Sequence, residues 1–140
     1  MRKHVTGDYI ENMIFNLVKD SPLHKAVSGG IYYYGTRPHG SRKEDIVIKF
    51  VTGFDYQIAT GSFQISVYIP DIDIGTPRWV KDVKRCLELS AIASEFVHNL
   101  NDNSEDFIFE LMQSIDTKRD EEAAQHFVRI RLQYRYFNIE

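Results

Sequence analysis

Apolar and polar side chains alternate without interruption between residues 128 and 136. The apolar set is Val128, Ile130, Leu132, Tyr134 and Tyr136, and the polar set between them is Arg129, Arg131, Gln133 and Arg135. Successive side chains on a β-strand leave on opposite faces, so this stretch predicts a strand with one face in a hydrophobic core. The other face carries three arginines, which must meet either water or a partner.

Helix signals mark the N-terminal part of the chain. Apolar residues recur at helical spacing over residues 8–20, and Thr6 and Asp8 are suitable caps for the start of this helix. Ser21-Pro22 combines a capping residue with a proline at the first helical position, which predicts one more short turn.

A longer helix is predicted in the middle of the chain. Thr76-Pro77 repeats the cap-and-proline pattern and is expected to open this helix. Apolar residues then recur at helical spacing: Cys86, Leu89, Ala93, Phe96 and Leu100. The polar residues 99–105 are expected to break the helix, which becomes the principal cover for the sheet.

Strand patterns occupy most of the remaining sequence. Strands are expected over residues 31–34, 45–51 and 56–69, with a turn at 52–55 and a loop at 71–75. Within the third strand the apolar positions change from even to odd numbers around Gly61, which predicts a β-bulge there.

Residues 107–115 fit a strand and a helix about equally well. We favour a strand, because the polar connection at 116–125 then leads directly into the final strand as a hairpin. The resulting order is α-β-β-β-α-β-β. This order predicts an α+β fold, a single domain over residues 1–140, with a mostly antiparallel sheet and two main helices packed on one face.

The sequence carries no pattern that points to catalysis, a metal or a cofactor. The five histidines are far apart, and the single cysteine, Cys86, is expected to be a buried small hydrophobe. Asp71 and Asp73 lack the other ligand positions of a calcium loop and are interpreted as turn residues. We therefore expect a protein that is not an enzyme and has no catalytic residues, no cofactor and no metal.

Two cationic features remain to be explained in a chain whose net charge is −3. The first is the row of Arg129, Arg131 and Arg135, which could be a solvent-exposed face paired with acidic neighbours such as Glu110, or a subunit interface. The second is an exposed loop over residues 35–44, whose candidate interaction residues are Arg37, His39, Arg42 and Lys43. This loop could be a solvated connection, an anion site, or a segment that orders on a neighbour.

Nucleic acid and membrane are the less favoured partners. The net negative charge and a pI near 5.9 argue against non-specific nucleic-acid binding, and the aromatic residues of the final strand lie opposite its arginines. No apolar segment approaches the ~20 residues that span a bilayer. We expect a soluble protein without a standard secretion signal.

Several short sequence segments resemble those of the tail terminator, or tail completion, proteins of long-tailed bacteriophages and prophages. They are Ser21-Pro22-Leu23, Gly30-Ile31-Tyr32, Arg37-Pro38, the strand at 63–68, the helix after Thr76-Pro77, and His126-Phe127-Val128-Arg129. The resemblance implies a structural protein of the virion tail, assembled in the bacterial cytoplasm. Such proteins form a ring, usually a hexamer, that caps the tail tube and meets the head–tail connector protein.

The partners implied by this resemblance are therefore further copies of the chain, the tail tube protein and the connector protein, with no cofactor and no catalytic residue. Two other functions stay open at the level of sequence. One is a different head–tail connector or adaptor protein of similar size. The other is a non-catalytic α+β ligand-binding domain, for which a pocket with convergent polar groups is expected.

Overall fold

The computed structural model describes residues 5–55, 58–75, 78–103 and 106–137. The helices are α1 (Gly7–Val18), α2 (Pro22–Ala26) and α3 (Val83–Leu100), and α3 continues into a short 3₁₀ turn, η1 (Asn101–Asn103). The strands are β1 (Ile31–Tyr33), β2 (Ile46–Phe54), β3 (Ile58–Pro70), β4 (Ile72–Asp73), β5 (Trp79–Val80), β6 (Phe107–Leu111), β7 (Asp116–Arg119) and β8 (Gln125–Phe137).

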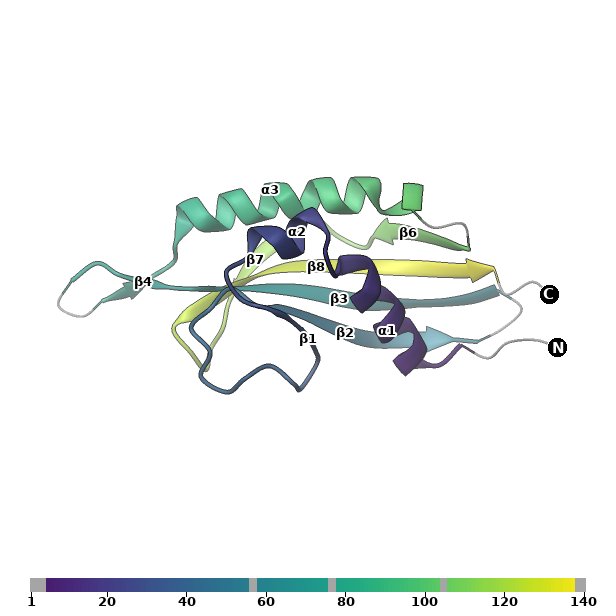
Figure 1. The fold of residues 1–140 in the computed structure, drawn as a ribbon, viewed down its shortest axis with the longest axis horizontal. Helices are drawn as coiled ribbons and strands as arrows, with labels where there is room; N and C mark the ends of the chain where they lie inside the picture. The colour runs from purple at the N-terminus through teal and green to yellow at the C-terminus, as the bar shows by residue number, and fades with distance from the viewer. Residues whose placement is uncertain (1–4, 56–57, 76–77, 104–105, 138–140) are drawn as a thin grey trace.

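Six strands form one mixed, mostly antiparallel sheet in the order β1-β2-β3-β8-β6, with β7 also paired to β8. Only β1 and β2 run parallel among these pairs. The long strands β3 and β8 form the centre of the sheet, and the helices lie over one of its faces (Figure 1). The predicted α+β class is therefore confirmed.

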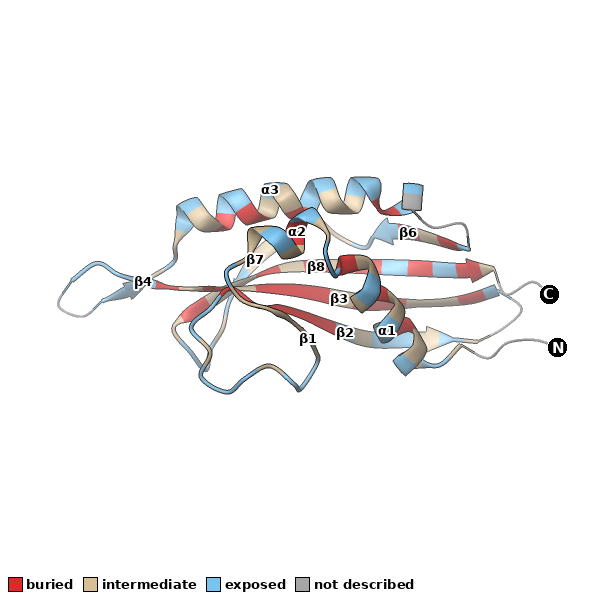
Figure 2. Ribbon diagram, viewed as in Figure 1, coloured by how far each residue is buried: buried red, intermediate tan, exposed pale blue. Residues whose placement is uncertain are grey.

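The core lies between this face and the helices. Buried apolar residues of β2, β3 and β8 form one cluster with Ile10 and Ile14 of α1 and with Leu89 and Ala93 of α3 (Figure 2). The predicted apolar set of the final strand, at 128, 130, 132, 134 and 136, is buried as expected. The opposite face of the sheet, called here the open face, carries the polar residues of the same strands.

Two of the three helix starts that were predicted from capping residues are confirmed. Thr6 caps α1 by accepting a hydrogen bond from the Tyr9 amide, and Ser21 caps α2 by accepting one from His24. The predicted start of the main helix is wrong, because α3 begins at Val83 with Asp82 as its N-cap. Thr76 and Pro77 lie outside the described residues, and Trp79 and Val80 that follow them belong to β5.

The bulge predicted at Gly61 is also wrong. The register between β2 and β3 shifts on β2, between Phe50 and Thr52, while β3 pairs with β8 without a break from Ile58 to Pro70. Ala59 is buried and Ile58 is 45% exposed, so the odd positions of β3 face the core throughout. The apolar pattern of the sequence changes from even to odd positions because Ile58, although apolar, is exposed. Tyr56, the other even apolar position in that pattern, lies outside the described residues.

Three segments expected to be turns or loops contain strand. β2 continues to Phe54 through the predicted turn at 52–55, and β4 occupies part of the loop predicted at 71–75. β6 confirms the strand interpretation of residues 107–115, but the connection predicted at 116–125 contains β7. Both β6 and β7 pair with the same edge of β8, one after the other.

Candidate interaction surface

Arg37 is folded inward from the loop at 35–44. Its Nε donates to Oδ2 of Asp45 at 2.9 Å, and its Nη2 donates to Oε1 of Gln125 at 3.1 Å. The guanidinium also lies over the ring of Tyr68, 4.2 Å from the ring centre. The side chain is 15% exposed, so Arg37 holds the loop against β2, β3 and β8 and does not point to a partner.

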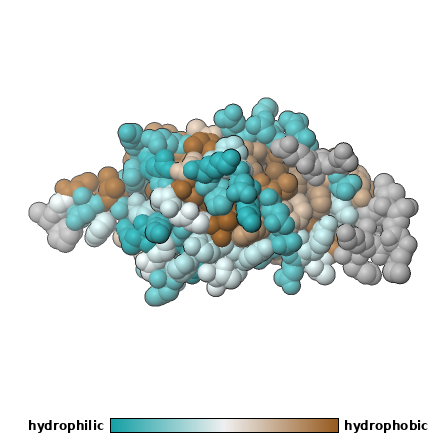
Figure 3. Space-filling model, in the orientation of Figure 1, coloured by the Kyte–Doolittle hydropathy of each residue, from teal (hydrophilic) through white to brown (hydrophobic). Residues whose placement is uncertain are grey.

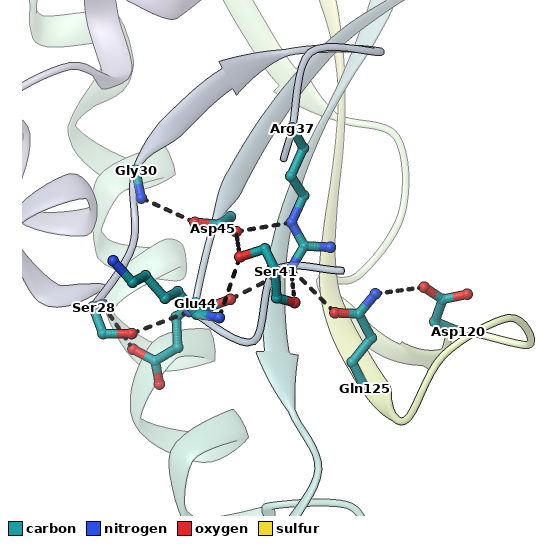
Figure 4. Close-up of polar contacts among 9 residues, drawn as sticks. Ser28, Gly30, Arg37, Ser41, Glu44, Asp45, Asp120 and Gln125 are labelled. Atoms are coloured by element: carbon teal, nitrogen blue, oxygen red, sulfur yellow. Dashed lines mark hydrogen bonds and ion pairs between the residues drawn. The ribbon is translucent and has the colours of Figure 1, made fainter. Parts of the chain in front are cut away.

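Asp45 is the centre of this network, as Figure 4 shows. Its carboxylate accepts hydrogen bonds from the Gly30 amide at 3.0 Å and from the Ser41 hydroxyl at 2.6 Å, in addition to the one from Arg37. Burial on its own would raise the pKa of Asp45, but the hydrogen bonds from Ser41, Arg37 and Gly30 outweigh it and the pKa is lowered. A charged carboxylate therefore joins β1, the loop and β2.

Arg42 is exposed but also engaged. Its Nη1 donates to the Ala124 carbonyl at 2.7 Å and its Nη2 to the Asp71 carbonyl at 3.4 Å. Its guanidinium lies 5.4 Å from the ring centre of Trp79 in β5. Arg42 thus connects the loop to the turn before β8 and to the β4–β5 hairpin.

His39 and Lys43 are exposed, as Arg42 is, but unlike Arg42 their side chains are not engaged by the described residues of the subunit. Within the described part of the chain, neither side chain makes a hydrogen bond or an ion pair. His39 lines a hollow of about 410 Å³ between the loop and the β7–β8 turn, opposite Asp120 and Glu122. That His39 and Lys43 contact a neighbour stays a prediction.

The arginines of β8 differ from one another in their surroundings. Arg129 pairs with Asp116 on β7 through two hydrogen bonds, 3.0 Å from Nε and 2.7 Å from Nη2. This hydrogen bond from Arg129 lowers the pKa of Asp116, against a smaller opposing effect of burial. Arg129 is therefore satisfied by its own sheet.

Arg131 and Arg135 lie further along the open face. Arg131 donates to Oε1 of Gln64 at 3.0 Å, and its buried Nε has no partner among the described residues. Arg135 lies 3.6 Å from Glu110 on β6, and both side chains are more than half exposed. The expected pairing of this face with acidic neighbours such as Glu110 is present, and only Arg135 of the three has a largely exposed side chain.

Of the arginine row, Arg135 lies at the opposite end of the open face from the loop set, whereas Arg129 lies near it, because Arg129 pairs with Ser66, two positions from Tyr68. Arg37 lies over Tyr68, whose strand partner is Phe127, whereas Arg135 pairs with Thr60 in the register of β3 and β8. Eight residues of strand separate positions 127 and 135, which corresponds to roughly 26 Å. The predicted residues therefore do not form one site.

Sequence reasoning missed the exposed apolar residues. The β4–β5 hairpin carries Ile72, Ile74 and Trp79, which are 45%, 58% and 52% exposed. At the other end of the sheet Val51, Phe54 and Ile58 are 41%, 58% and 45% exposed. The signal available in the sequence was the pair of short apolar runs on either side of Gly75-Thr76-Pro77, which is typical of a hairpin.

A groove of about 500 Å³ lies on the helical side, between the turn after α1 and the C-terminal half of α3. Its apolar lining is Leu17, Pro22, Ile92, Phe96 and Leu100, and Lys19, Asp20 and Glu95 are among its polar residues. In the space-filling view, hydrophobic surface is visible between the helices and again at the end that carries β4 (Figure 3).

Neither a metal centre nor a membrane helix is found in the described residues. They contain no group of three or more histidine, cysteine, aspartate or glutamate side chains that could hold a metal ion. No helix among them combines the length and hydrophobicity needed to cross a bilayer. No model of a known protein family matches the sequence, and a search of curated proteins finds no significant match.

Proposed function

We propose that this chain is a structural subunit resembling a tail terminator, which assembles into a ring, expected to be a hexamer, on the end of a phage tail tube. In this proposal the ring meets the tail tube protein on one side and the head–tail connector protein on the other, within the virion tail. The support is the resemblance of the sequence, together with an α+β fold of the class that this resemblance implies.

The observation that carries the proposal is two groups of exposed apolar residues, one on the β4–β5 hairpin and one where β2 ends and β3 begins, and these elements lie at opposite ends of the molecule (Figure 1). The hairpin residues Ile72, Ile74 and Trp79 mark one end, and Val51, Phe54 and Ile58 mark the other. A ring subunit that also meets a tube and a connector needs more than one contact surface. Head-to-tail contacts between different surfaces close into rings when the rotation between subunits permits it.

The geometry also narrows the candidate contact residues. Arg37, Arg42 and Arg129 hold the subunit together and Arg131 donates to Gln64, so the contacts with neighbours are assigned to the remaining candidates, His39, Lys43 and Arg135. Arg135 borders a hollow of about 310 Å³ on the open face together with Phe54 and Met112. An exposed arginine beside apolar side chains is a common composition for an interface.

Electron microscopy of the protein mixed with its tail tube protein tests the proposal. Capped tubes of uniform length are expected, and Arg135→Glu should weaken capping, whereas Lys84→Glu on the exposed side of α3 should not. Tubes that continue to grow in the presence of the wild-type protein would exclude a terminator function. Saturable binding of a small molecule in the groove between α1 and α3 would instead favour the ligand-binding alternative.

A further inference from the structure

The β4–β5 hairpin is a well-formed ribbon that extends beyond the rest of the molecule (Figure 1). Ile72 pairs with Val80 and Asp73 with Trp79. The Asp73 carboxylate accepts hydrogen bonds from the Gly75 amide at 2.9 Å and from the Arg78 amide at 3.0 Å, and the Ile74 amide donates to the Arg78 carbonyl at 2.9 Å. These bonds fix which side of the ribbon each side chain occupies.

One side of this ribbon is apolar and exposed. Ile72 and Ile74 lie on the same side, because alternate residues of a strand share a face, and Arg78 lies opposite Ile74 on that side. Trp79 is on the other side, where the guanidinium of Arg42 lies 5.4 Å from its ring centre. A two-stranded ribbon has no core of its own, so Ile72 and Ile74 can be buried only against another surface.

The groove between α1 and α3 offers a surface of matching chemistry. Its floor is apolar, with Ile92, Phe96 and Leu17, and its charged residues are Asp20, Glu95 and Lys19, which sum to a net negative charge. The exposed charged side chains of residues 72–75 and 78–81 are Arg78 and Lys81, which are positive, and Asp73, which is negative, so they sum to a net positive charge. The Asp73 carboxylate accepts hydrogen bonds from the amides of its own turn.

The hairpin cannot fill the groove of its own subunit. It joins α3 at the N-terminal end, whereas the groove is lined by residues 92–100 in the C-terminal half. Val83 and Ile92 are nine positions apart, which corresponds to roughly 14 Å along a helix, and the hairpin extends in the opposite direction (Figure 1). A second copy of the chain can supply the hairpin without this restriction.

We propose that Ile72 and Ile74 of one copy insert into the groove between α1 and α3 of the next copy, with Arg78 facing Asp20 and Glu95. The contact joins two different surfaces, so it propagates head to tail. This inference rests on the proposed ring and assigns its subunit contact. The remaining apolar end of the sheet, with Phe54, is then left for the tail tube protein or the connector.

Cysteine cross-linking of the full-length chain tests the contact. The double variant Ile74→Cys with Glu95→Cys, both at exposed positions, should give a ladder of disulfide-linked oligomers after mild oxidation, up to the ring size. Each single variant should give no species larger than a dimer. A ladder absent from the double variant, with tube capping intact, would overturn the hairpin contact and leave the proposed function standing.

A charge exchange provides an independent measurement. Arg78→Glu and Glu95→Arg should each weaken self-association at least fivefold in sedimentation experiments, and the two changes together should restore it. Lys84→Glu is the matched control and should leave association unchanged. If the two changes together weaken self-association by the product of their single effects, the proposed contact is contradicted. If the double variant regains self-association but caps no tubes, the contact stands and the terminator function is excluded.

Discussion

Gly53 and Gly61 face each other across β2 and β3, and the hydroxyl of Tyr134 lies next to both. A Cβ atom at residue 61 would come within 2.3 Å of the Thr52 carbonyl oxygen and 2.6 Å of that hydroxyl. The glycine therefore provides space for a tyrosine from β8 and for the backbone of β2. This close approach, and not the bulge that the sequence pattern predicted, explains its position in a strand.

Gly61→Ala should lower the free energy of unfolding by about 2–3 kcal/mol, because the neighbouring backbone must move. Adding Tyr134→Phe should not restore stability, since the contact with Thr52 remains. Gly40→Ala is a useful comparison: its φ of +72° makes alanine unfavourable, but the space is open, so a loss of only about 1 kcal/mol is expected. Urea unfolding measures the stability of all three variants. An unfolding midpoint of Gly61→Ala equal to that of the wild type would contradict a close approach at this glycine.

At the scale of elements, Arg85 fastens helix α3 to the beginning of β2. Its Nε donates to Oε2 of Glu44 at 2.5 Å and its Nη2 to Oε1 at 2.9 Å, and Nη2 also donates to the Ala26 carbonyl at the end of α2. The Glu44 carboxylate raises the pKa of Arg85, against an opposing effect of burial. Glu44 is only 9% exposed, so Arg85 pairs with a carboxylate that has little contact with solvent.

Arg85→Met should destabilise the fold by about 2–3 kcal/mol, because it leaves the Glu44 carboxylate buried without a cation. Glu44→Gln in the same chain should recover part of the loss, and the coupling obtained from the double-mutant cycle is expected to exceed 1 kcal/mol, on the order of measured contact couplings. Glu88→Gln removes the exposed partner of Arg85 and should change stability by less than about 0.5 kcal/mol. Equal losses of stability from Glu88→Gln and Arg85→Met would contradict the view that Glu44 is the partner through which Arg85 stabilises the fold.

Asp82 determines where α3 begins, since its carboxylate accepts a hydrogen bond from the Arg85 amide at 3.1 Å. Asp82→Ala should therefore cost about 1 kcal/mol of stability, measured by thermal or urea unfolding. The adjacent exposed Lys81→Ala serves as the control and should have little effect. A neutral Asp82→Ala would indicate that the helix does not depend on this cap.

The sequence allowed prediction of the elements whose signal is local. The alternation at 128–136 and the caps Thr6 and Ser21 depend on neighbours in the chain, and these predictions are confirmed. The partners of the cationic residues were not predictable in the same way, because Arg37 meets Gln125 across 88 positions. The β4–β5 hairpin was missed because two paired residues per strand are too few to show a period.

At the scale of the whole molecule, one face of the sheet supports the helices and the other carries polar side chains. At the end of the sheet near the loop, the hydrogen bonds of Asp45 join β1, β2 and the loop. Arg37 and Gln125 extend this network to β8 (Figure 4). Gln125 continues the chain of contacts by donating to Asp120 at 2.7 Å. The orientation of the exposed residues His39 and Lys43 therefore depends on a buried carboxylate.

The stability of the protein should depend on pH through this carboxylate. The pKa of Asp45 is lowered from its ordinary value of 3.8, so the folded state binds this proton less readily than the unfolded chain does. Its contribution is present above about pH 4 and is lost as the pH falls through the lowered value. Urea unfolding between pH 7 and pH 2 should show a gap between wild type and Asp45→Asn that narrows below pH 4.

Asp116→Asn is the matched control for this measurement. The pKa of Asp116 is lowered as well, chiefly by the hydrogen bond from Arg129, but its side chain is 37% exposed, against 1% for Asp45. Solvent screens the exposed pair more strongly, so Asp116→Asn should produce the smaller gap at neutral pH. A gap between wild type and Asp45→Asn that stays constant down to pH 2 would show that the charge of Asp45 does not stabilise the fold.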